Sequence, residues 1–114
     1  MVDNKSYIPE RSHAVWISLS PQAGHEQADR RPSVVLSPQS YNEKVGLALF
    51  CPITSQVKGY PFEVSIPEGL DISGVVLSDQ IKSLDWRAWR VEFICSLPNT
   101  AIEEVIAKAR ALLD

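Results

Sequence analysis

Two short polar stretches carry the side chains of this sequence that are best suited to chemistry. One runs Gly24-His25-Glu26-Gln27 and continues to Arg31-Pro32, and the other is Pro52-Ile53-Thr54-Ser55-Gln56. A carboxylate and an imidazole can move protons near neutral pH, whereas arginine is a permanent cation whose planar fork of donors suits a phosphate. Each stretch is expected where a strand meets a loop, a frequent position for binding and catalytic groups.

The same residues also have plainer roles, because polar loop residues are usually only solvated. Arg31, directly before a buried strand, can pair with a carboxylate, and Thr54 can satisfy a backbone group at a strand end. The sequence contains no G-x-x-x-x-G-K-[ST], G-x-S-x-G or H-E-x-x-H motif. We expect no metal site and no cofactor, since ligand spacing is absent from the cysteines and histidines at positions 13, 25, 51 and 95.

Length and composition predict one domain over residues 1–114. The 114 residues are 45% hydrophobic and 22% charged, which is enough apolar surface for a core and gives no disorder signature. No apolar run reaches the roughly 20 residues of a membrane helix, and the polar N-terminus does not resemble a secretory signal. Two cysteines are too few for a disulfide scaffold. We therefore expect a cytoplasmic protein without a membrane partner.

The net charge of −3 argues at first against a nucleic-acid partner, because such domains are typically basic. The acidic excess, however, lies entirely within residues 67–114, whereas residues 1–66 are neutral overall. Exposed charges are screened beyond about 10 Å at physiological salt. The overall charge therefore says little about any one groove of the protein.

Short strands separated by turn residues account for most of the chain. Alternating or β-branched apolar residues predict strands over residues 13–19, 33–37, 46–53, 62–66, 74–78, 81–84 and 89–95. Residues 38–45 are expected to form a polar turn, and Pro52 implies an edge or a bulge near the end of its strand. The spacing of roughly 8–12 residues between strands favours a small barrel over a parallel α/β sheet.

The last segment changes to a helical period. Apolar residues from Ile102 to Leu113 form one stripe of an amphipathic helix. Thr100 and Glu103 have the spacing of a capping box, in which each side chain satisfies a free backbone N–H at the start of the helix. The pattern therefore predicts a mostly β domain that ends in one α-helix.

Several blocks of this sequence resemble the MazF family of toxin endoribonucleases. They lie in order from about Tyr7 to the end of the chain, and several are four or more residues long: Gly24-His25-Glu26-Gln27, Arg31-Pro32, Val35-Leu36-Ser37-Pro38, Pro52-Ile53-Thr54-Ser55, Lys58-Gly59-Tyr60-Pro61-Phe62-Glu63-Val64, Gly74-Val75-Val76-Leu77 and Asp79-Gln80-Ile81-Lys82-Ser83. The resemblance implies a small SH3-like β-barrel with a C-terminal helix. It also implies a sequence-specific ribonuclease that cleaves single-stranded RNA without a metal.

The resemblance implies that Arg31 and Thr54 are the catalytic pair. The PemK/Kid branch of the family instead uses positions that map to His25 and Asp79. This sequence has both sets, but Leu77 stands where that branch has an arginine, so Arg31 and Thr54 are the preferred assignment.

Cleavage by the RNA 2′-hydroxyl also needs a base, for which arginine is poorly suited because its pKa lies above about 12. Glu26 and His25 both have ordinary pKa values closer to neutrality, and either can take the proton. A plain RNA-contact role for His25 is about equally compatible with the sequence. The expected RNA-binding residues carry amide, hydroxyl, carboxyl or ammonium groups: Gln27, Ser55, Gln56, Lys58, Asp79 and Gln80. Trp86 and Trp89 could stack on bases, but packing in the core or at an interface is favoured for both.

The resemblance further implies a homodimer and a cognate antitoxin that blocks the RNA groove with an extended acidic segment. Two rival functions remain at this point. One is a gyrase poison like CcdB, which relies on a C-terminal tryptophan, whereas this chain ends Ala111-Leu112-Leu113-Asp114. The other is a binding module that kept the fold and lost catalysis.

Overall fold

A computed structural model describes residues 7–18 and 30–114 of the chain. Within them, seven strands and two helices follow one another, and the predicted mostly β class with a C-terminal helix is confirmed. The elements are β1 (His13–Ser18), β2 (Arg30–Val35), α1 (Gln39–Val45), β3 (Leu47–Thr54), β4 (Glu63–Ser65), β5 (Val75–Leu77), β6 (Lys82–Asp85), β7 (Glu92–Ser96) and α2 (Asn99–Ala111).

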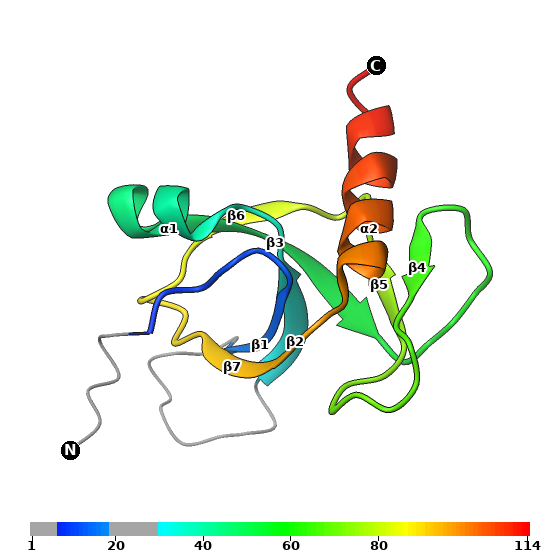
Figure 1. Ribbon diagram of the computed structural model, residues 1–114, viewed down its shortest axis with the longest axis horizontal. Coiled ribbons are helices and arrows are strands. Elements are labelled where there is room, and N and C mark those ends of the chain that lie inside the picture. Colours follow the sequence, from blue (N-terminus) through cyan, green and yellow to red (C-terminus); the bar gives the residue numbers. More distant parts are fainter. Residues whose placement is uncertain (1–6, 19–29) are drawn as a thin grey trace.

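The strands form one antiparallel sheet in the order β4-β5-β3-β2-β1-β7, with β6 also paired to β3. Figure 1 shows β3 crossing the centre of the molecule, with α1 beside one end and α2 beside the other. In the described part of the chain β4 and β7 are not paired to each other, so the sheet curves without closing into a barrel.

Successive side chains along β1, β2 and β3 point to opposite faces of the sheet, so the apolar core is divided into two clusters, one on each face. One face packs against α2 in a cluster of small and branched side chains, among them Val34, Cys51, Ile53, Ile102 and Val105. The opposite face carries a second cluster, formed by Val15, Ile17, Val35, Ala48, Phe50 and Trp86. We call this second surface the open face, because neither described helix contributes a residue to its core.

The partner of β3 changes along one of its edges. Leu47 to Phe50 pair with β6, whereas Ile53 and Thr54 pair with β5. Pro52 lies between these two ladders, and on the other side it pairs with Ser33 of β2. A proline has no N–H to donate, so its place at the break agrees with the expected irregularity, although β3 is a central strand and not an edge.

The expected polar turn over residues 38–45 is wrong, because Gln39–Val45 form helix α1. Pro38 precedes the helix and its carbonyl accepts the N–H of Asn42 at 3.0 Å. Gly46 ends the helix in the left-handed conformation, with φ of 82°. Proline at the start and glycine at the end are a recognised helix pattern, but seven residues are too few to show a clear apolar period.

The predicted capping box at the start of α2 is also wrong. The helix begins at Asn99 after Pro98, whose φ of −66° already suits a helix, and no side chain caps it. The carbonyl of Pro98 accepts the N–H groups of Ala101 and Ile102 instead. Thr100 therefore lies inside the first turn, where its side chain cannot act as the cap.

Within the described residues, neither helix has the length and apolar character needed to cross a membrane.

Candidate functional site

Arg31 and Thr54 lie at the same end of the β2–β3 pair. The ladder matches Ser33 with Pro52, and each of the two site residues lies two positions further toward that end of its own strand. Side chains two apart on a strand share a face. Arg31 and Thr54 are therefore both on the open face, as is Ile17, which pairs with Arg31 across β1.

Arg31 is part of strand β2, which begins earlier than the strand expected from residue 33. Its backbone pairs with Ile17 of β1, and the neighbouring Arg30 pairs with Ser18. The guanidinium is exposed, and one of its nitrogens donates to the carbonyl of Arg30 at 3.2 Å. A rigid strand therefore holds the base of this cationic side chain.

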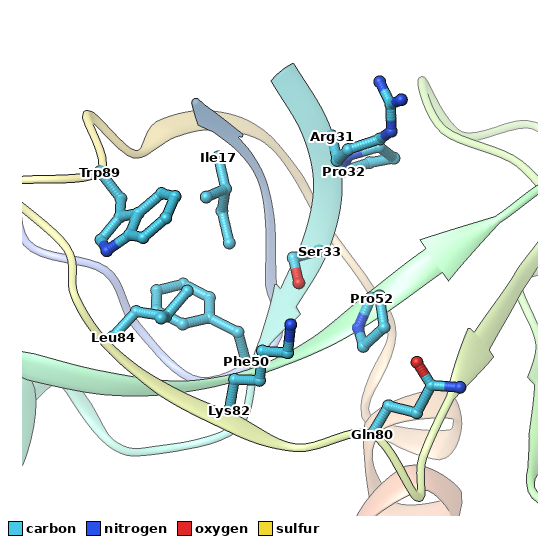
Figure 2. A pocket seen from close by; sticks show the side chains of 10 residues that line it. All are labelled: Ile17, Arg31, Pro32, Ser33, Phe50, Pro52, Gln80, Lys82, Leu84 and Trp89. Carbon is cyan, nitrogen blue, oxygen red and sulfur yellow. The ribbon is translucent and has the colours of Figure 1, made fainter. Parts of the chain in front are cut away.

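The first hollow of the open face has a volume of about 340 Å³. Figure 2 shows Ile17, Phe50, Leu84 and Trp89 gathered around one end, and Arg31 and Gln80 toward the other. The ammonium group of Lys82 extends into the space between these two ends. The remaining lining residues are Pro32, Ser33 and Pro52. This site thus combines an apolar wall with cationic and amide groups.

A second hollow of about 170 Å³ adjoins the first. It is lined by Thr54, Gln56, Lys58, Tyr60, Glu63, Leu77 and Gln80. Gln80 lines both hollows, and so it connects the hollow that contains Arg31 with the hollow that contains Thr54. The structure therefore brings several residues selected from the sequence to one continuous surface: Arg31, Thr54, Gln56, Lys58 and Gln80.

The hydroxyl oxygen of Thr54 accepts the backbone N–H of Gln56 at 3.1 Å. A hydroxyl has one proton to donate besides its two acceptor sites, so this bond leaves its own O–H available for a ligand. The backbone of Thr54 pairs with Val75 of β5, which fixes its position at the end of β3.

Glu63 organises the loop of residues 55–62, which forms the wall of the second hollow. Its two carboxylate oxygens accept the backbone N–H groups of Lys58 and Gly59, at 2.9 and 3.0 Å. From α2, the ammonium group of Lys108 donates to the carbonyls of Pro61 and Glu63 at 2.7 and 3.1 Å. The carboxylate of Glu63 in this hollow therefore stabilises the loop by binding its backbone N–H groups.

Asp79 binds the hydroxyl of Tyr60 and lines neither hollow. Its other oxygen, Oδ1, is buried and has no hydrogen-bond partner among the described residues. The hydrogen bond to Asp79 is the main cause that raises the pKa of Tyr60 above its ordinary value. Burial raises the pKa of the Cys51 thiol to about 12, and the charge of Asp79 adds to that shift.

The remaining residues predicted for the site divide into two groups. His25, Glu26 and Gln27 lie outside the described residues. Ser55 is exposed beside Thr54 but lines neither hollow. The assignment of individual catalytic and RNA-binding roles therefore stays a prediction.

Three polar residues that the structure places in these hollows, Lys82, Tyr60 and Glu63, were not predicted for the site, and Trp89 was considered for base stacking but expected to pack. Lys82 lies two positions after Gln80 in the same motif block, so the selection of Gln80 could also have pointed to Lys82. Glu63 lies in a motif block, but its place in the hollow depends on the path of the 55–62 loop, and the place of Trp89 depends on the turn after β6.

No group of three or more histidine, cysteine, aspartate or glutamate side chains that could hold a metal ion occurs within residues 7–18 and 30–114.

Comparisons with known proteins agree on one family. A family model described as "PemK-like, MazF-like toxin of type II toxin-antitoxin system" matches residues 10–113. The endoribonuclease toxin MazF of Escherichia coli K12 is 50% identical over 82 residues, covering 72% of this chain and 73% of the relative. The endoribonuclease PemK of Escherichia coli is 32% identical over 108 residues, covering 91% of this chain and 81% of the relative. A crystal structure of MazE–MazF from Deinococcus radiodurans superimposes with a TM-score of 0.86 at 44% identity, covering 95% of this chain and 97% of that one.

Proposed function

This chain belongs to the PemK-like, MazF-like toxin family of type II toxin–antitoxin systems, and from that premise we propose how its open face cleaves RNA. The protein is an endoribonuclease toxin that a cognate antitoxin neutralises. We propose that it is sequence-specific and metal-independent, and that it cuts single-stranded RNA by attack of a ribose 2′-hydroxyl on the adjacent phosphorus. The relatives named endoribonucleases favour this activity over a gyrase poison or a non-catalytic binding module.

In the proposed step the 2′-oxygen forms a bond to phosphorus and the bond from phosphorus to the 5′-oxygen breaks. The products are a 2′,3′-cyclic phosphate and a free 5′-hydroxyl, whose oxygen takes a proton from water or from the protonated base as it leaves. Negative charge grows on the phosphoryl oxygens during the reaction. Arg31 is suited to stabilise that charge, because its guanidinium is permanently charged and its backbone is fixed in strand β2.

Thr54 is proposed to donate a hydrogen bond to the same phosphate. The bond from the Gln56 N–H occupies one acceptor site of its oxygen and leaves the O–H for the phosphate. The common face and common strand end of Arg31 and Thr54 are the observation that carries this proposal. A phosphate between them would have a cationic fork on one side and a hydroxyl on the other.

The base that takes the 2′-hydroxyl proton is proposed to be Glu26 or His25. Both lie outside the described residues, so the proposal rests on their ordinary pKa values and on the family resemblance. Gln56, Lys58 and Gln80 are proposed to hold the flanking nucleotides, because they line the second hollow. A side-chain amide can bind base edges, and an ammonium group suits the phosphate backbone.

The antitoxin is proposed to cover the open face with an extended acidic segment. The groups that attract phosphate, Arg31, Lys58 and Lys82, would equally attract carboxylates. A homodimer in the cytoplasm is proposed as the active form on the same family grounds. Sedimentation of the purified toxin, alone and with its antitoxin, tests both assemblies.

The direct test incubates purified protein with single-stranded RNA in EDTA and identifies the ends of the products. We expect discrete cleavage that leaves 2′,3′-cyclic phosphate and 5′-hydroxyl ends. RNA carrying a 2′-deoxynucleotide at the cleavage position should stay intact, because it lacks the attacking oxygen. Intact natural RNA, or cleavage that an Arg31→Ala protein performs equally well, would overturn the proposal.

Sequencing the 5′ ends of the products identifies the recognised bases. The base assignment is tested separately with Glu26→Gln and His25→Ala proteins across a range of pH. In at least one of these proteins the cleavage rate should no longer rise with pH as it does in the wild type. Wild-type rates for both proteins at every pH would exclude both residues as the base.

A further inference from the structure

The first hollow has chemistry that phosphate binding alone does not explain. We infer that its apolar end is a subsite for one unstacked nucleobase of the RNA, next to the phosphate held by Arg31, with Trp89 as the residue on which the base stacks. This inference rests on the proposed ribonuclease function and deepens it. We call this part of the hollow the base subsite, and its walls are Ile17, Phe50, Leu84 and Trp89.

The size of the hollow suits a small planar group. Its volume of about 340 Å³ lies at the lower end of the range of about 300–1,000 Å³ that small-molecule pockets occupy. A solvated phosphate gains nothing from apolar walls, because burying a charge beside hydrocarbon is unfavourable. A nucleobase has two apolar faces and a polar edge, so it matches both ends of this hollow.

The polar end of the hollow matches the edge of a base and its phosphate. Gln80 presents an amide, which can donate and accept at a base edge, and Lys82 and Arg31 carry positive charge. No acidic side chain is among the described residues that line this hollow. The charge therefore favours a ligand that carries phosphate close to its apolar group, as a nucleotide does.

Trp89 is held in place for such a role. Its backbone N–H donates to the carbonyl of Asp85 at 3.1 Å, and its own carbonyl accepts the N–H of Ser18 from β1 at 3.0 Å. Two elements thus fix the residue while its ring stays half-buried at the hollow. Aromatic stacking contributes about 1–3 kcal/mol per base in single-stranded recognition.

Trp86 shows what a purely structural tryptophan looks like in the same turn. It is only 4% exposed, it belongs to the core of the open face, and its indole N–H donates to the carbonyl of Asn42 at 2.9 Å. Within the described residues the indole N–H of Trp89 has no such partner. The two rings therefore differ in burial and in hydrogen bonding, and only Trp89 faces the hollow.

The test measures cleavage of an RNA oligonucleotide that contains the mapped cleavage site, using Trp89→Leu and Trp89→Phe proteins. Trp89→Leu should raise KM roughly tenfold to a hundredfold with little change in kcat, and Trp89→Phe should recover most of the loss because it can still stack. Trp16→Leu is the matched control, since Trp16 lies on the other face of the sheet beneath Arg30. Thermal unfolding of each protein verifies that it is folded.

A second arm replaces one base at a time by an abasic residue in the same oligonucleotide. An abasic residue at one position beside the cleaved bond should weaken RNA binding to the wild-type protein. The same replacement should have little further effect on binding to the Trp89→Leu protein. Independent, additive losses at every position would overturn the inference, as would an unchanged KM for Trp89→Leu. Weakened antitoxin binding with unchanged RNA cleavage would assign the hollow to a protein side chain and would also overturn it. A wild-type protein that leaves RNA intact would instead refute the proposed function.

Discussion

Gly74 lies directly against the backbone of Thr54. A Cβ atom built on Gly74 would overlap the carbonyl oxygen of Thr54, and it would lie 2.9 Å from the carbonyl carbon and 3.2 Å from the Cα of Ser55. The φ of Gly74 is +116°, a conformation that side chains disfavour. The close approach of β5 to the end of β3 therefore depends on a residue without a side chain.

A Gly74→Ala protein should be destabilised and should lose activity. The added methyl group must move the backbone of Thr54, which we place at the scissile phosphate, so the cleavage rate should fall at least tenfold. Gly69→Ala is the matched control: Gly69 has a φ of +93°, but a Cβ atom added there would meet no other atom within 4 Å. Denaturant unfolding and cleavage assays should show a loss of about 1–2 kcal/mol for the control and more for Gly74→Ala. Equal losses in both proteins would show that the contact with Thr54 is unimportant.

Arg30 and Arg31 are adjacent residues whose side chains lie on opposite faces of β2. Their alanine substitutions should therefore have different effects on cleavage and on stability. Arg30 lies 4.3 Å above the ring of Trp16 and pairs with Glu92 at 3.3 Å. Arg31→Ala should lower kcat by about 10²–10³, the usual loss for one donor to a transition-state charge. Arg30→Ala should keep kcat within a factor of three and lower stability by at most about 1 kcal/mol, since its ion pair is exposed.

Single-turnover cleavage at saturating RNA is the measurement for these two proteins. A loss of the same size for Arg30→Ala would mean that both arginines reach the RNA, contrary to their placement on opposite faces of the strand.

The strand pattern is predictable because apolar alternation is strong in this chain. Val15 and Ile17 on one face and Ala14 on the other already show in the sequence which residues of β1 face which core. Helix α1 escapes prediction because its signals are a flanking proline and glycine and not a period. The start of α2 differs from the predicted one because Pro98 begins the helix before the Thr100–Glu103 pair can cap it.

The site is predictable only in part. Family resemblance identifies Arg31 and Thr54, side-chain chemistry selects Gln80, and the fold places all three around two adjoining hollows. The packing role that the sequence favours for Trp89 is confirmed, because the residue packs against the core of the open face, but the sequence does not show that its ring also lines the hollow. Asp79 is expected at the RNA, whereas in the structure it binds Tyr60, a contact that depends on the path of the 55–62 loop.

The two thiols should be slow to react in the folded protein. Cys51 is fully buried and its pKa is raised to about 12, so almost none of it is thiolate at pH 8. Burial also raises the pKa of Cys95, but that residue is only partly buried. We expect iodoacetamide to label Cys95 first, to label Cys51 only after unfolding, and to leave RNA cleavage unchanged while Cys51 is intact. Rapid labelling of Cys51 in the native protein would contradict its place in the core.

His13 belongs to a half-buried cluster and is not a simple surface residue at a strand end. Its Nδ1 accepts the hydroxyl of Tyr7 at 2.9 Å and faces the N–H of Glu10 at 3.4 Å. Its ring stacks on Tyr7 and meets the edge of Phe93 with ring centres 4.7 Å apart. The backbone N–H of Glu10 needs an unprotonated Nδ1 as its acceptor, so this arrangement favours the neutral imidazole.

Stability should therefore fall as the pH drops below about 6.5. Burial lowers the pKa of His13 in the folded protein, and the charge of Glu10 opposes this shift only in part. The unfolded chain, with an ordinary histidine pKa of about 6.5, then binds more protons than the folded one, so this contribution is fully present above that pH and is lost below it. Urea unfolding between pH 7.5 and 5.5 should show a shallower decline for His13→Gln than for wild type, because glutamine keeps an acceptor for Tyr7 but does not titrate. Parallel curves for the two proteins would mean that His13 binds protons equally in both states, and the cluster would then have no part in the acid sensitivity of the fold.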